Sequence, residues 1–525
     1  MIVGAGAAGC VLAYRLSEDP KNSVALIEAG ASHRHPFIDM PKGLGKILQS
    51  PKFTWPFPTE PEDGTAGEVE YWLRGKVLGG STSVNGMMYV RGQPADFDEI
   101  AARSSDDWSW QHIGAAYAAL ESHELGAAET RGAKGPLRVS MPVMKDRLSE
   151  AMIAAGEAMG LPRKLDVNAP DNGPAVGYAP RTIYKGRRES AATAFIDPIR
   201  KRPNLTIITN AMVDRVLFDG KRATSVLASV DDASQTFAAK REIIIAGGAL
   251  ASPTILQRSG IGPADLLKQH GISVVHDSPQ VGQNLIEHRA LLMQWKLREP
   301  LSQNLHFSGL RLLGVTAQYF MKRTGMMASA AYEVGAWLKS RPELPRPDLQ
   351  FLLAPFSFDF ASKRTKLEPF HGIHTVAYPL RPTSRGEINI RSKNPGDMPI
   401  LKPNYHSTAE DRRTMIDLIK VARQYANQTP LRALIEVETY PGPAATTDDE
   451  LIAAYDKFGS CGFHAVGSCR MGSDAESVVD PELRVRGVDN LRVMDTSIIP
   501  QIPSGNTNGP TMAMAWRAAD LILRA

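Results

Sequence analysis

The amino terminus carries the pattern that most constrains how this chain can fold. An apolar start at residues 1–3 is followed by Gly4-x-Gly6-x-x-Gly9, a helix-forming run and a second apolar run, Val24–Ile27. In a strand–turn–helix–strand unit of this kind, Gly4 permits the tight turn, Gly6 lets the backbone approach a pyrophosphate, and Gly9 lets the helix pack closely on the strand. The first amides of the helix then face the phosphates. The pattern therefore predicts a dinucleotide site at this turn.

An acidic residue at the end of the second apolar run supports the same interpretation. Glu28 stands where a carboxylate can accept hydrogen bonds from a ribose diol, and its charge would repel a 2′-phosphate, which disfavours NADP. A bare glycine turn is weak evidence, because it also fits a simple helix cap. The strand before it, the helix after it and the acid together favour the dinucleotide.

The composition excludes several other classes of protein. Of the 525 residues, 43% are hydrophobic and 22% are charged, as in a globular protein with a sizeable core and several domains. The net charge of +4 is spread along the chain without basic runs, so nucleic acid is not an expected partner. Cys10, Cys461 and Cys469 are too few and too scattered for a disulfide framework or a metal site. No apolar run is long enough to span a membrane, and no signal peptide precedes the first strand, which favours the cytoplasm.

The middle of the chain alternates between irregular and informative stretches. Residues 31–69 are rich in proline, glycine and aromatics, and they predict a long excursion over a surface or a cofactor, without a helix. In residues 75–91, a glycine pair, three small hydroxyl residues and Asn85 make either a structural loop or a backbone that lies flat against a planar ligand. Residues 205–230 predict a β-meander, and residues 242–259 predict another strand, glycine turn and helix.

The second half of the chain changes character twice. From Leu291 to Pro441, strand-like runs alternate with loops and predict an α+β domain built on an antiparallel sheet. The final stretch again predicts loops, a short strand and a helix like those at the start of the chain. His464 lies in a glycine-rich loop, a short strand ends at Asp495, and a helix follows with Pro510 in its first turn. The amino end of that helix would offer partial positive charge to a nearby anion.

Four motifs in this order resemble the glucose-methanol-choline (GMC) flavoprotein oxidoreductases over nearly the whole chain: the opening fingerprint and residues 75–91, 248–262 and 464–508. The resemblance implies FAD as the cofactor and an α/β, Rossmann-like FAD-binding domain, with an α+β substrate domain over the flavin. It divides the chain into an FAD-binding part, residues 1–140, 195–290 and 455–525, and a substrate-binding part, residues 141–194 and 291–454.

The resemblance also implies which residues contact FAD. The adenine-diphosphate end would be held by the fingerprint and Glu28, and the remaining contacts follow the cofactor toward the flavin. The implied set is Gly4, Gly6, Gly9 and Glu28, Val213 near the adenine, Asp495 near the diphosphate and ribityl chain, Ser81, Asn85, Gly86 and Met88 along the flavin, and Asn508, Gly509 and Thr511 at the isoalloxazine.

The family's active site pairs a histidine with a second histidine or an asparagine, and the matching positions here are His464 and Asn508. Oxidising an alcohol removes a hydroxyl proton and a carbon-bound hydride. Neutral His464 would take the proton as hydride moves to flavin N5. Asn508 cannot accept the proton, so it would orient the oxygen.

The expected reaction is oxidation of a primary alcohol, aromatic or aliphatic, to the carbonyl, with oxygen, a quinone or another carrier as the electron acceptor. FAD is expected to be non-covalent, because residues 81–85 contain no histidine. Five aromatic residues are candidates for an apolar pocket, although ordinary core is the favoured interpretation of each: Trp337, Phe351, Phe356, Phe358 and Phe360.

Other functions are alternatives to the oxidation of an alcohol. The main alternative is a different FAD chemistry on the same scaffold, such as that of a hydroxynitrile lyase or a fatty acid photodecarboxylase. An NAD-dependent dehydrogenase is disfavoured, because the chain has no second dinucleotide fingerprint. A flavoprotein without turnover is disfavoured by the presence of both the candidate base and its partner.

Overall fold

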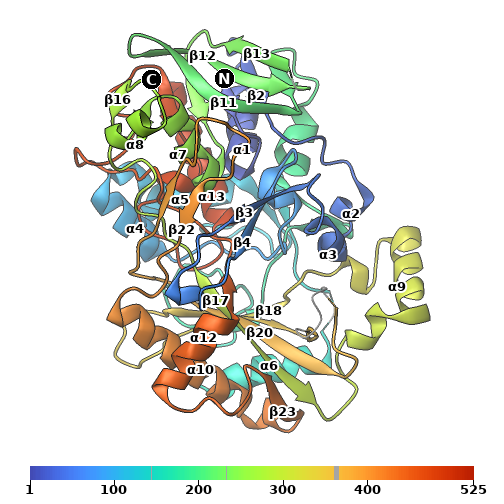
Figure 1. Cartoon of the computed structure of the whole chain (residues 1–525). Coiled ribbons are helices and arrows are strands. Elements are labelled where there is room, and N and C mark those ends of the chain that lie inside the picture. The colour runs from blue at the N-terminus through green and yellow to red at the C-terminus, as the bar shows by residue number, and fades with distance from the viewer. Residues whose placement is uncertain (144, 232, 360–365, 525) are drawn as a thin grey trace.

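Two layered regions make up the computed structural model, which describes residues 1–143, 145–231, 233–359 and 366–524 (Figure 1). The upper region in the view holds both ends of the chain, and the lower region holds a large antiparallel sheet with helices beneath it. Among the residues described, no helix is both long and apolar enough to cross a membrane.

A five-stranded parallel sheet forms the core of the upper region. Its strands are short and mostly apolar, and the side chains of its central strands are mostly buried on both faces, as expected where helices cover a parallel sheet. Helix α1 (Ala7–Leu16) follows the first strand and packs against the last helix, α13 (Asn508–Arg524). The predicted Rossmann-like α/β class is confirmed. The strand order is β10 (Leu205–Ile208), β2 (Val24–Ile27), β1 (Ile2–Val3), β14 (Ile243–Ile245) and β25 (Leu491–Val493).

A three-stranded antiparallel meander lies beside this sheet at the top of Figure 1. It consists of β11 (Ala211–Asp219), β12 (Arg222–Val230) and β13 (Ala233–Ala238). Gly220 has φ +57° in the turn between the first two strands, a conformation that glycine adopts without strain. The predicted hairpin of residues 211–230 is therefore present, but the first run of the predicted meander, residues 205–208, is β10 and pairs in parallel with β2 instead. The third strand of the meander is β13.

A seven-stranded antiparallel sheet forms the lower region, as predicted for the α+β part of the chain. Helices α6 (Arg147–Ala158), α10 (Ala409–Ala426) and α12 (Asp448–Phe458) pack on one of its faces. The opposite face is turned toward the parallel sheet. The strands are β23 (Ile435–Tyr440), β17 (Arg289–Leu297), β20 (Gly372–Pro379), β19 (Leu349–Ala354), β18 (Val334–Leu338) and β7 (Ala175–Tyr178), with β24 (Gly459–Cys461) also paired to β17.

The segment of residues 31–69 is more regular than the sequence predicts. It contains two short helices, α2 (Pro36–Asp39) and α3 (Leu44–Ile47), and a strand, β3 (Thr54–Pro58), that pairs with β4 (Tyr71–Gly75). The expectation of an excursion without a helix was wrong here, although the helices are one turn each. The two prolines of β3 made this strand unexpected from the sequence, because proline has no backbone N–H to donate to a neighbouring strand. They are tolerated here because β3 pairs with only one strand, β4.

Candidate active site

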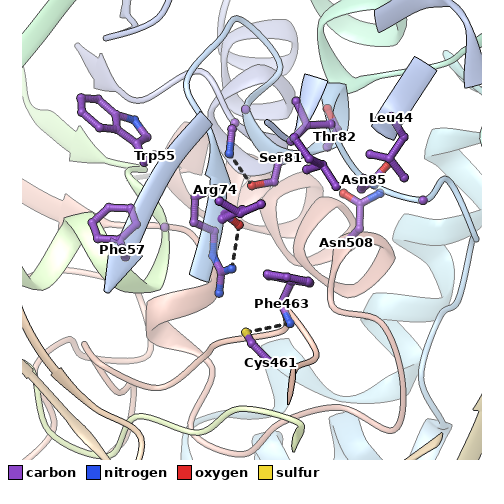
Figure 2. A pocket seen from close by; sticks show the side chains of 18 of the residues that line it. Leu44, Trp55, Phe57, Arg74, Ser81, Thr82, Asn85, Cys461, Phe463 and Asn508 are labelled. Atoms are coloured by element: carbon purple, nitrogen blue, oxygen red, sulfur yellow. Dashed lines mark hydrogen bonds between the residues drawn. The ribbon is translucent and has the colours of Figure 1, made fainter. Parts of the chain in front are cut away.

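A cavity of about 1930 Å³ lies between the carboxyl edge of the parallel sheet and the free face of the antiparallel sheet. This volume exceeds that of a usual small-molecule site and suits a dinucleotide with a substrate beside it. Figure 2 shows this pocket, with Trp55 and Phe57 of the β3–β4 hairpin on one side and Ser81, Asn85 and Asn508 on the other. Most of the predicted site residues line it: Gly4, Gly6, Glu28, Ser81, Asn85, Gly86, Met88, Val213, His464, Asp495, Asn508 and Thr511.

The glycine turn at the start of α1 leaves room for a phosphate group. A Cβ added at Gly6 would meet nothing within 4 Å, because this residue faces the cavity at the amino end of the helix. A Cβ at Gly9 would lie 1.9 Å from the Gly4 carbonyl oxygen, so this glycine sits inside the helix–strand contact instead. Gly509 is likewise outside the lining, and a Cβ added there would lie 2.3 Å from the Val90 carbonyl oxygen. A bare backbone at a helix amino end fits the pyrophosphate of FAD.

Glu28 is buried at the same end of the cavity. Its carboxylate accepts hydrogen bonds from the amides of Ala5 (2.9 Å) and Gly30 (2.8 Å). Burial raises the pKa of Glu28 to about 6, against the lowering effect of these amides. The two bonds fix the carboxylate at the edge of the glycine turn, where its remaining lone pairs suit a ribose diol.

Asp495 joins the second strand–glycine–helix unit to the last strand of the sheet. It accepts hydrogen bonds from the amides of Gly248 (2.9 Å) and Ser497 (2.7 Å) and from the Ser252 hydroxyl. Its carboxylate is thus occupied by protein donors at the floor of the cavity. This arrangement places the β14 turn and the β25 turn together at the edge where dinucleotides bind.

His464 lies at the opposite end of the predicted set, in contact with a second histidine. The Nδ1 atoms of His464 and His288 are 3.0 Å apart, and His288 Nε2 is 3.0 Å from the carbonyl oxygen of Leu380. A carbonyl can only accept, so His288 Nε2 carries a proton, and the neutral His288 has its lone pair on Nδ1. His464 must then donate from Nδ1. Its Nε2 is left with a lone pair.

The surroundings keep both rings neutral. Burial, the neighbouring His288 and the Arg74 guanidinium hold the pKa of His464 well below its ordinary value. Burial lowers the pKa of His288 to about 4. The buried Glu287 carboxylate accepts a hydrogen bond from the backbone amide of His464 (2.7 Å), and it lies 3.4 Å from the Arg74 guanidinium. These two contacts fix the loop that carries the histidine. The site therefore presents an unprotonated imidazole nitrogen to the cavity at neutral pH.

The sequence analysis missed the asparagine that meets this nitrogen. Asn506 Nδ2 is 2.9 Å from His464 Nε2, whereas the side chain of Asn508 has no hydrogen bond within the described part of the chain. The two asparagines are alike in sequence, and the turn at Gly505 (φ +139°) decides which one faces the histidine. Gly505 was the one available signal, because a residue at such a φ redirects the chain just before the helix.

The aromatic candidates divide between cavity and core. Phe356 and Phe358 line the cavity. Phe351 and Trp337 are buried in hydrophobic clusters on the two faces of the antiparallel sheet, as ordinary core. Phe360 lies outside the described residues. No group of histidine, cysteine, aspartate or glutamate side chains able to hold a metal occurs in the portion of the chain that the structure describes.

Comparisons with known proteins agree along the whole chain. A family model described as GMC oxidoreductase matches residues 1–290, and a second model with the same description matches residues 382–515. The chain is 38% identical to an alcohol dehydrogenase (acceptor) of Pseudomonas putida, over 100% of this chain and 95% of that protein. It is 39% identical to an oxygen-dependent choline dehydrogenase of Pectobacterium atrosepticum, over 100% of this chain and 94% of that protein. Pyridoxine 4-oxidase from Mesorbium loti has a similar structure, with a TM-score of 0.90 and 30% identity over 100% of this chain and 99% of that one.

Proposed function

The chain belongs to the GMC oxidoreductase family, and we propose that it oxidises a primary alcohol to the carbonyl with His464 as the base. At the level of the family it is an FAD-dependent oxidoreductase that acts on CH–OH donors. The observation that carries the finer proposal is the lone pair on His464 Nε2, which the chain Leu380–His288–His464 leaves facing the cavity.

The proton moves at a defined atom in this proposal. The substrate hydroxyl donates to His464 Nε2, which accepts the proton as the C–H bond breaks. Bound FAD supplies the hydride acceptor. Without substrate, the Asn506 amide donates to this lone pair at 2.9 Å. The substrate hydroxyl would take its place, and the displaced amide could then donate to the substrate oxygen and hold it beside the base. His288 keeps its neighbour in the productive tautomer without touching the substrate.

We propose that the predicted residues that line the cavity hold the cofactor, while Gly9 and Gly509, which lie outside the lining, act through close backbone packing. Gly6 and Glu28 would hold the diphosphate and ribose end, and Ser81, Asn85 and Asn508 would contact the flavin end. We propose non-covalent binding, which an intact mass measured after denaturation would test. Electrons would leave the reduced cofactor to oxygen, a quinone or another carrier.

The wall near the base suits an apolar alcohol. Ala290, Leu292, Leu352 and Val376 line it from neighbouring strands of the antiparallel sheet. The relatives named above are a choline dehydrogenase, an alcohol dehydrogenase and a pyridoxine oxidase, so they favour alcohol oxidation over the lyase and photodecarboxylase alternatives.

A panel of alcohols tests the proposal. Purified protein is mixed with each alcohol without oxygen while the flavin spectrum is followed, and peroxide is measured in a parallel aerobic assay. We expect His464→Ala to retain FAD and to slow flavin reduction by about 10²–10⁴-fold, the usual contribution of a general base. Reduction of the variant at the wild-type rate would remove His464 from this role.

A further inference from the structure

A lysine in the cavity wall has fewer partners than its charge requires. Lys42 lies in a short 3₁₀ turn (Pro41–Gly43), is half-buried and lines the cavity. Its Nζ donates to the carbonyl oxygen of Ala330 (2.7 Å) and is 4.9 Å from the centre of the Phe356 ring. An ammonium has three donor hydrogens, so it has capacity for a further acceptor.

Lys42 has no ion-pair partner of its own among the residues that the structure describes. The nearest ion pair joins Arg181 and Glu333 at 2.9 Å, and both members are buried. Glu333 attracts Lys42 only at longer range, since no carboxylate of the residues described lies within 4.0 Å of the lysine. Burial lowers the pKa of Lys42 to about 8, which still leaves the ammonium mostly charged at neutral pH. A charge withdrawn from water in this way is normally paired.

The same wall connects Lys42 to the base. Phe356, beneath the lysine, packs on His374 of β20 with 4.8 Å between ring centres. Tyr378, on the same face of that strand, lies 5.4 Å from the His464 ring. A strand advances about 3.3 Å per residue, so the four steps from His374 to Tyr378 separate the two ends of the wall by about 13 Å. Apolar residues, among them Leu352 and Val376, lie between.

We propose that the substrate is an alcohol with a carboxylate at the far end of an apolar body, and that Lys42 binds this carboxylate. The inference rests on the proposed function, because it names the substrate class for the reaction at His464. A neutral alcohol would leave the lysine without a directly paired anion, and a quaternary ammonium group such as that of choline would be repelled at this end of the wall.

A series of ω-hydroxycarboxylates of increasing chain length tests the proposal, each compared with the n-alkanol of the same length. We expect a hydroxycarboxylate of optimal length to exceed its alkanol in kcat/KM by about 10- to 100-fold, the effect of one charge-assisted hydrogen bond in a partly desolvated site. Lys42→Met should abolish this preference, and Lys42→Arg should restore part of it. Lys46→Met is the matched control, because Lys46 also lines the cavity but is exposed.

A second measurement separates this inference from the alcohol oxidation itself. Binding of unreactive n-alkanoates to the FAD-loaded protein is measured by equilibrium dialysis, and Lys42→Met should weaken it by a similar factor while Lys46→Met should not. An unchanged preference in Lys42→Met, or no preference for the anion at any length in the wild type, would overturn the role of Lys42. Normal alkanoate binding with no flavin reduction by any alcohol would instead count against the proposed function alone.

Discussion

The tautomer of His464 depends on His288, so replacing His288 measures how much this tautomer contributes to the rate of flavin reduction. In His288→Leu, the Nδ1 proton of His464 loses its acceptor at 3.0 Å, and the buried donor is left unsatisfied. An unmet buried hydrogen bond costs about 1–3 kcal/mol. The ring can escape this cost by moving its proton to Nε2, where it blocks the base. The fraction of active tautomer then falls by about 5- to 150-fold, and the rate of flavin reduction falls with it.

The assay is stopped-flow reduction without oxygen, with His288→Asn as the matched control. Both variants lose the donor to Leu380, but the asparagine side-chain oxygen can still accept from His464 Nδ1. We expect His288→Asn to recover most of the rate, while FAD content and thermal stability stay similar in the two variants. If leucine and asparagine slow reduction equally, His288 acts through packing and the tautomer argument is refuted.

Three further predictions follow from the same geometry. The pKa of His464 is held well below its ordinary value, so the rate of flavin reduction should stay constant between about pH 8 and about pH 6. The rate should decline only at lower pH, as the ring becomes protonated. A midpoint of this decline at or above the ordinary histidine pKa of about 6.5 would contradict the prediction. Gly6→Ala should fold with unchanged secondary structure but purify without FAD, whereas Gly9→Ala should lower the thermal stability of the protein. Circular dichroism and flavin fluorescence follow both effects. A Gly6→Ala variant that purifies with bound flavin would refute the position of the phosphate beside Gly6. Asn506→Ala should slow reduction by about 2- to 13-fold, the loss of one neutral hydrogen bond, with Asn508→Ala as its comparison; a larger effect from Asn508 would restore that residue as the partner of His464.

Sequence reasoning succeeded where a local pattern determines the structure. The fingerprint from Gly4 to Gly9 fixes a turn, a helix amino end and a helix–strand contact within a few residues, so its geometry can be read from spacing. The apolar runs of β2 and β14 are equally local. The family resemblance then supplied the order in which these pieces combine.

The remaining features depend on contacts that no local pattern reports. His288 reaches His464 because β17 pairs with β24, residues more than 160 positions later in the chain, and nothing in its own neighbourhood marks it. Asn506 replaced Asn508 beside the histidine through a single backbone turn. Lys42 lay in a segment that the sequence predicted to be irregular, so its place in the wall could not be anticipated.

The position of β1 at the centre of its sheet has a consequence for biosynthesis. The ribosome makes this strand well before one of its neighbours, β14 at residues 243–245, and before the outer strand β25 at residues 491–493. Asp495 and Asn506 follow still later. The apolar surface of the segment around β1 therefore stays incompletely covered until the residues of β25 have been translated. Flavin insertion is expected only after residues 491–506 have been made, and a chain truncated before residue 491 should fail to retain the cofactor.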